Sequence, residues 1–119
     1  MLTRKQETGN EGEKIAVNFL KKKKKYRIIE KNWRYKNGEI DIIAQDDAIT
    51  VFVEVRTRQK DALVSGYFSI TKKKKSSLKP VLEAYINRNY LQYFRFDVVE
   101  IVLDRENVEI FHYENVPFF

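Results

Sequence analysis

The sequence predicts an α/β fold in which two helices pack against one mixed sheet. Apolar residues recur at helical spacing in two segments, and the remaining apolar segments are rich in β-branched and aromatic residues. Short turn signals separate the strand-like segments, and no repeat or Pro/Gly/Ser-rich linker divides the chain. The expected order is helix, three strands, helix and two strands, in a single domain over residues 1–119.

The first helix is expected over residues 5–24, because Ala16, Val17 and Leu20 form an apolar stripe at helical spacing. Three strands are then expected, over residues 26–34, 39–45 and 49–56. Asn37-Gly38 predicts a tight turn between the first two strands. Asp46-Asp47 marks the turn between the second and the third.

The second half begins with a long connection over residues 57–71. A helix follows and ends near Asn89, but its start stays open because Pro80 suits a first turn or a kink better than a helix interior. Two closing strands are expected over residues 94–103 and 108–113.

Composition excludes several kinds of site. The 119 residues contain no cysteine, which rules out disulfides, thiolate zinc sites and cysteine nucleophiles. The single histidine, His112, is expected to be structural or exposed. Oxygen ligands would therefore hold any metal, so Mg²⁺, Mn²⁺ or Ca²⁺ is expected. No stretch approaches the roughly 20 apolar residues of a membrane helix, and the polar N-terminus lacks a signal peptide, so we expect a cytoplasmic protein.

Charge is distributed in blocks. Residues 1–36 carry twelve Lys/Arg and four acids, residues 37–55 carry five acids and no base, and residues 56–88 carry nine bases and two acids. A polyanion would explain the basic blocks, because lysine and arginine neutralise phosphates. The alternative interpretation is that the lysine runs are solvated helix faces.

Glu13 is a candidate functional carboxylate on the first helix. Its neighbours three, four and seven positions later are apolar, so Glu13 lies at the end of the stripe that faces the sheet. A half-buried carboxylate is costly unless it is paired or binds a cation. The alternative is an acidic residue near a helix N-terminus, where the helix dipole favours it.

Asp41 and Glu54 are the second set of candidates. A two-residue turn at Asp46-Asp47 would put Asp41 opposite Phe52 and diagonal to Glu54, whereas a four-residue loop would put it directly opposite Glu54. Either even loop places both carboxylates on one face, whereas an odd loop would separate them, so the prediction depends on the length of the hairpin loop. Two adjacent carboxylates repel, and a magnesium ion would resolve that conflict.

Phosphodiester hydrolysis suits this arrangement. A metal ion neutralises the attacked phosphate and lowers the pKa of an attacking water. Arg56 lies two residues after Glu54, so it shares its face and would stabilise developing negative charge. Arg56 would not act as a general base, because a guanidinium stays protonated.

Several short segments, spread through almost the whole chain, carry a family resemblance: Gly9, Gly12-Glu13, Asn32-Trp33-Arg34, Gly38-Glu39-Ile40-Asp41, Phe52-Val53-Glu54-Val55-Arg56 and Arg95-Phe96-Asp97-Val98-Val99. With these segments the chain resembles the YraN-type family of small bacterial proteins, which is described as endonuclease-like. The underlying Asp-x12-Glu-x-Lys pattern is similar to that of restriction-endonuclease-like nucleases, in particular the archaeal Holliday junction resolvases.

This resemblance implies an αβββαβ core with a mixed sheet flanked by helices. It also implies a catalytic metal site at Asp41 and Glu54 with Glu13 from the helix, occupied by Mg²⁺ or Mn²⁺. The implied substrate is DNA, branched or otherwise structured, and the implied assembly is often a homodimer. Arg56 departs from the pattern, which has Lys there. A lysine from the second helix, for example Lys72, would compensate.

Two other functions stay open. The first is a catalytically inactive nucleic-acid-binding protein on the nuclease scaffold, which the Arg56 departure favours. The second is a protein–protein adaptor whose basic blocks serve solubility or bind an acidic partner.

Six basic residues are candidates for contacts with phosphates: Arg34, Lys36, Arg58, Lys60, Lys72 and Lys73. Arg34 and Lys36 alternate with Trp33 and Tyr35, which would stack on bases or, alternatively, pack at a sheet edge. Arg58, Lys60 and Tyr67 belong to the long connection, expected either to contact DNA or to be a solvated loop.

Overall fold

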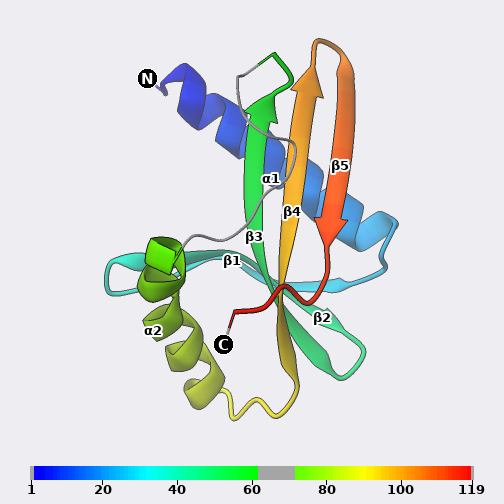
Figure 1. Cartoon of the computed structure of the whole chain (residues 1–119). Coiled ribbons are helices and arrows are strands. Elements are labelled where there is room, and N and C mark those ends of the chain that lie inside the picture. Colours follow the sequence, from blue (N-terminus) through cyan, green and yellow to red (C-terminus); the bar gives the residue numbers. More distant parts are fainter. Residues whose placement is uncertain (1, 62–71, 119) are drawn as a thin grey trace.

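A five-stranded mixed sheet with one helix on each face forms the protein (Figure 1). The computed structural model describes residues 2–61 and 72–118. The elements in chain order are α1 (Arg4–Lys22), β1 (Arg27–Tyr35), β2 (Gly38–Asp46), β3 (Ile49–Gln59), α2 (Lys72–Arg88), β4 (Phe94–Asp104) and β5 (Asn107–Tyr113). The strands lie in sequence order across the sheet, and only β3 and β4 are parallel. The predicted element order and fold class are confirmed.

The helix α1 begins at a capping box in which Thr3 and Gln6 bond each other's backbone N–H. Ala16 and Leu20 are fully buried against β2, β3 and β4, as the apolar stripe predicts. Figure 1 shows α1 crossing behind the strands, on the face that carries Val51 and Val53.

The helix α2 covers the opposite face. Leu78, Val81, Leu82 and Tyr85 are its buried residues, and they pack with Phe52 of β3. Pro80 lies inside the helix, although proline usually ends or kinks one. The helix continues because residues on both sides of the exposed Pro80 are anchored in the core. Across the part of the chain that is described, neither helix is long and apolar enough to span a membrane.

The turn between β2 and β3 differs from the prediction. Asp47 and Ala48 form it, and Asp46 already pairs with Ile49. The expected turn at Asp46-Asp47 is therefore wrong. Asp47 takes a left-handed conformation (φ 55°), which aspartate tolerates and which suits a two-residue hairpin turn. The resulting register is the one that the four-residue alternative predicted.

Strand β3 is longer than predicted. It extends to Gln59 because its residues from Thr50 onward pair in parallel with β4. Arg58 is consequently a strand residue, and the Lys60 N–H donates to Leu103 O (2.8 Å). The rest of the expected connection, including Tyr67, lies outside the described residues.

The sheet forks at the end of the β2–β3 pairing. Ile42 and Val53 form the last pair, beyond which β3 continues beside β4 alone. Ile42 packs on the α1 side, whereas Ile40 packs on the α2 side, so β2 twists between them. In Figure 1, β1 and β2 turn away from the upper part of β3, β4 and β5. The residue at this twist is Asp41.

Candidate active site at the sheet fork

Asp41 lies across from Glu54 where β2 leaves β3. The register of the last pair, Ile42 with Val53, places the two carboxylate residues opposite each other. The backbone N–H of Val55 is not used by β2 and donates instead to Asp41 Oδ2 (2.8 Å). Glu54 is 9% exposed, so the pair is largely withdrawn from water. The predicted juxtaposition of these carboxylates is thus present.

The environment of Asp41 disfavours its charge. Burial is the main cause that raises the pKa of Asp41 to about 8, and the neighbouring Glu54 carboxylate adds to the effect. The Val55 hydrogen bond opposes this shift, and the more distant Glu13 reinforces it. The Asp41 carboxyl therefore keeps its proton to a higher pH than an ordinary aspartate does. A divalent cation would stabilise both carboxylates in their charged form and displace that proton.

Glu13 reaches the same region from α1. Asn32 of β1 donates from Nδ2 to Glu13 Oε1 (3.0 Å) and to Glu39 Oε1 (2.7 Å), linking the helix to the β1–β2 hairpin. Glu13, Asp41 and Glu54 all line one open pocket of about 550 Å³. This bridging role of Asn32 was not predicted from the sequence. Two features of the sequence could have drawn attention to Asn32. It is a polar residue within a predicted strand, and asparagine tolerates the left-handed backbone conformation that Asn32 adopts (φ 52°).

Gly12 allows α1 to approach the sheet closely enough for this geometry. A Cβ at Gly12 would lie 1.8 Å from Thr57 Oγ1, whereas one at Gly9 would meet nothing within 4 Å. The absence of a side chain at Gly12 thus sets the distance between α1 and β3. Because Glu13 is the next residue, this contact also determines where its carboxylate lies.

Lys74 of α2 forms an ion pair with Glu54. Its Nζ lies 3.7 Å from Glu54 Oε2. Lys72, named above as the example of a compensating lysine, is exposed at the first residue of the helix. Arg56 is exposed and lies in register with Glu100 of β4. The structure therefore brings a helix lysine to the pair, two residues further along the lysine run.

The six residues predicted to contact phosphates fall into two groups. Arg58 and Lys60 form ion pairs with acids of β4 and β5: Arg58 Nε lies 3.8 Å from Glu100 Oε2, and Lys60 Nζ, although exposed, lies 3.3 Å from Glu109 Oε1. The other four are exposed and, within the described part of the chain, form no ion pair with those strands: Arg34, Lys36, Lys72 and Lys73. Among them, Arg34 also forms an ion pair with Glu39 (3.1 Å).

Few protein side chains are placed to bind a cation at the fork. Within residues 2–61 and 72–118, no three His, Asp or Glu side chains gather closely enough to form a ready-made metal site. A cation would therefore be held by the Asp41–Glu54 pair and by water, a coordination that Mg²⁺ commonly adopts. The residues present fit Mg²⁺ or Mn²⁺, since the pair supplies oxygen ligands and two negative charges.

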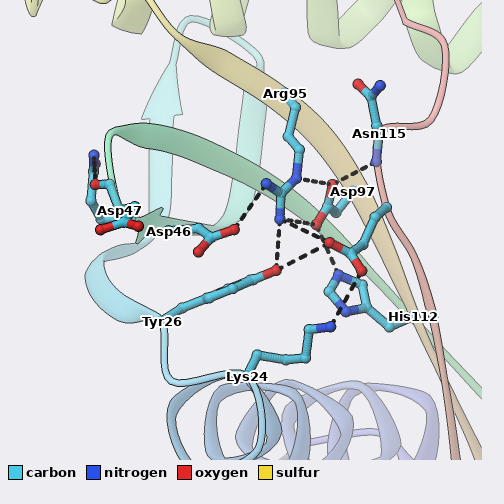
Figure 2. Close-up of polar contacts among 10 residues, drawn as sticks. Lys24, Tyr26, Asp46, Asp47, Arg95, Asp97, His112 and Asn115 are labelled. Carbon is cyan, nitrogen blue, oxygen red and sulfur yellow. Dashed lines mark hydrogen bonds and ion pairs between the residues drawn. The ribbon is translucent and has the colours of Figure 1, made fainter.

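A second polar cluster is centred on Asp97 of β4, which is in register with Val53 of β3 (Figure 2). Asp97 is 0% exposed and accepts hydrogen bonds from Arg95 Nε (3.0 Å), His112 Nε2 (2.8 Å) and the Asn115 N–H (2.9 Å). Burial alone would raise the pKa of Asp97, but these hydrogen bonds outweigh it and hold the pKa below its ordinary value. Glu114 also accepts from Arg95 (3.3 Å), so the cluster fastens the segment after β5 to β4. His112 is thus bonded to Asp97 through Nε2, while its Nδ1 is buried without a hydrogen-bond partner among the described residues.

Fold and site together define a class of protein. The αβββαβ order, with acidic residues on the second and third strands and on the first helix, is compatible with the restriction-endonuclease-like core. The chain belongs to the family described as "Uncharacterised protein family UPF0102", whose model matches residues 12–101. This confirms the family resemblance drawn from the sequence motifs.

Relatives in several bacteria match over most of their length. A "UPF0102 protein" of Carboxydothermus hydrogenoformans is 36% identical over 117 residues, covering 97% of this chain and 98% of the relative. One from Caldicellulosiruptor saccharolyticus is 46% identical over 107 residues, covering 87% and 88%. One from Clostridium botulinum strain Kyoto is 42% identical over 102 residues, covering 83% and 82%.

Proposed function

We propose that this protein is a metal-dependent endonuclease that cleaves phosphodiester bonds in DNA. The observation that carries the proposal is the pair of carboxylates, Asp41 and Glu54, which face each other at the sheet fork beside a lysine ammonium. An aspartate with a raised pKa beside a second carboxylate in an open pocket is typical of a functional site.

Each residue of the site has a distinct role. Asp41 and Glu54 would hold Mg²⁺ or Mn²⁺, which when bound polarises the phosphate and activates a water. The Lys74 ammonium lies next to Glu54 and would stabilise negative charge that develops on the phosphate. Arg56 adds a permanent positive charge on the same strand. Glu13 would orient water in the pocket, and Asn32 holds its carboxylate in place.

The substrate class follows from charge and from the family resemblance. The formal net charge is +6. The lysine run at the start of α2 includes Lys74, which pairs with Glu54, and Glu54 lines the pocket. Such charge favours a polyanion. Because the motifs resemble those of junction resolvases, a four-way DNA junction is the first substrate to test, with a plain duplex beside it.

A cleavage assay tests this proposal. End-labelled junction and duplex are incubated with wild type, Glu54→Gln and Glu106→Gln, with Mg²⁺ or with a chelator. Glu106 is exposed in the turn after β4, so its variant makes the same charge change far from the fork. The proposal expects Mg²⁺-dependent cuts by wild type and Glu106→Gln. It expects none by Glu54→Gln, which should still bind DNA in a mobility-shift assay.

The alternative is a DNA-binding protein without turnover, which the arginine at position 56 favours. Binding by wild type that weakens steeply with salt, with no product on either DNA, would establish that alternative. Cuts that persist in Glu54→Gln would exclude the fork as the active site.

A further inference from the structure

A pair of aromatic rings flanked by cations lies on β1, beside the fork. Trp33 and Tyr35 are two residues apart and on the same side of the strand, with rings parallel to within 4° and centroids 6.4 Å apart. The Arg88 guanidinium lies over both rings, 5.7 Å from the Trp33 centroid and 5.1 Å from that of Tyr35. Lys36 Nζ lies 5.4 Å from the Tyr35 centroid. We call Trp33, Tyr35, Lys36 and Arg88 the β1 aromatic surface.

The ring pair packs against the core on one side and stays partly exposed on the other. Trp33 meets the buried Tyr85 edge to face, with centroids 5.2 Å apart, and Tyr85 in turn meets Phe52 in the core. Trp33 and Tyr35 nevertheless stay half-buried, and β1 is an edge strand of the sheet. The expectation that Trp33 packs at a sheet edge is thus met, with part of the ring pair left accessible.

Charge around the rings favours an anionic partner. Lys36 and Arg88 are exposed, and both lie over the rings. Burial and the nearby Glu30 carboxylate raise the pKa of Tyr85, so Glu30 is an acid on this side. Arg34 points to the other side of β1, where it forms an ion pair with Glu39. Cations therefore outnumber acids beside the rings. Aromatic rings interleaved with arginine and lysine are the combination that binds nucleotides by stacking and by phosphate contacts.

The surface is continuous with the proposed active site. Trp33 pairs with Ile40 across the β1–β2 ladder, and the residue after Ile40 is Asp41. Asn32, directly before Trp33, bonds Glu13 and Glu39. A strand of nucleic acid whose phosphate lies at the fork would therefore pass close to this surface.

We propose that the β1 aromatic surface stacks an unpaired base of the bound DNA strand next to the phosphate at the fork. This inference rests on the proposed function for its substrate, and it adds a preference for DNA with unpaired nucleotides over fully paired duplex. In a duplex the base faces are already stacked, so the rings would gain nothing from them.

Intrinsic fluorescence tests the inference directly, because Trp33 is the sole tryptophan of the chain. A short oligothymidine and a fully paired duplex are titrated separately into the wild-type protein in chelator, so that no hydrolysis is involved. We expect saturable quenching by the oligothymidine and much weaker quenching by the duplex. No quenching by an oligothymidine whose binding is visible by anisotropy of its own label, or equal quenching by both DNAs, would overturn the inference.

Variants separate stacking from structure. Tyr35→Ala should weaken oligothymidine binding about tenfold, whereas Tyr35→Phe should keep it, since the ring and not the hydroxyl stacks. Tyr93→Ala serves as the control, because Tyr93 is 63% exposed in the loop before β4 and away from the surface. Thermal unfolding of each variant verifies the fold. Equal weakening by Tyr93→Ala, or none by a folded Tyr35→Ala, would contradict the proposal.

The result is distinguishable from that of the cleavage assay. Quenching without Mg²⁺-dependent cuts would keep the stacking surface and reject the nuclease. Cuts without quenching would keep the nuclease and reject the surface.

Discussion

Lys74 Nζ lies 3.7 Å from Glu54 Oε2, although the two residues come from different elements and are twenty positions apart. Lysine offers a compact ammonium, whereas the arginine at position 56 offers a delocalised planar charge. Under the proposed function, Lys74 of α2 would take the place of the lysine that the nuclease pattern has on the strand. Cleavage by the wild-type protein would then decide against the inactive alternative that the Arg56 departure favours.

Lys74→Ala should lower the rate of DNA cleavage about tenfold to a hundredfold, because it removes the charge nearest the carboxylate pair. Lys72→Ala is the matched control, with the same change in charge at an exposed position of the same run. Single-turnover cleavage rates on the same DNA measure both. Equal losses in the two variants would mean that the run acts only as a diffuse basic patch.

Gly12→Ala should destabilise the fold by about 1–3 kcal/mol, because the new methyl would overlap Thr57. Gly9→Ala should instead raise stability, by up to about 1 kcal/mol, because alanine favours the helix and nothing lies in its way. Urea unfolding of both variants is the measurement. A neutral Gly12→Ala would show that α1 does not pack tightly on β3.

The stability of the metal-free protein should depend on the Asp41 proton. The pKa of Asp41 is raised to about 8 from an ordinary 3.8, so the folded chain keeps a proton that the unfolded chain loses. The free energy of unfolding should therefore fall as pH rises from about 4 to 8. Asp41→Asn cannot ionise, so its stability relative to wild type should increase over this range. Urea unfolding in chelator at several pH values tests this, and parallel profiles would contradict it.

Asp97 should have the opposite dependence on pH. Its pKa is lowered in the folded state, so it contributes stability above about pH 4 that is lost as pH falls through the folded pKa. Asp97→Asn should lower the free energy of unfolding by about 3 kcal/mol at pH 7, because it breaks a buried pair with Arg95. The variant should also lose less stability than wild type as pH falls. The control is Asp104→Asn, an exposed partner of Lys60 that should change stability by about 0.5 kcal/mol or less. Equal costs at the two positions would reject this view of the cluster.

The sequence alone predicted the parts of the molecule that depend on local patterns. The order of the elements followed from periodicity, and the Asp41–Glu54 pairing followed from strand alternation in one hairpin. The length of β3 did not, because its last residues pair with β4, which lies beyond the second helix. The position of Lys74 at Glu54 was equally out of reach, since it depends on how α2 is rotated on the sheet.

Roles that arise from side-chain networks were also missed. Asn32 bonds carboxylates of two other elements, so its role appears only when α1, β1 and β2 are brought together. The ion pair between Arg58 and Glu100 of β4 was likewise not predicted, and the expected phosphate contact of Arg58 stays a prediction. No local pattern distinguishes a cation that faces solvent from one that faces a neighbouring strand.

We propose that Asp41 and Glu54 together hold a divalent cation. Calorimetric titration of Mn²⁺ into the protein tests this binding most directly. Wild type and Glu106→Gln should show the same saturable binding at pH 8, and Asp41→Asn should show none, because a single remaining carboxylate is a weak ligand. Saturable binding that is unchanged in Asp41→Asn, or absent from the wild-type protein, would contradict the account.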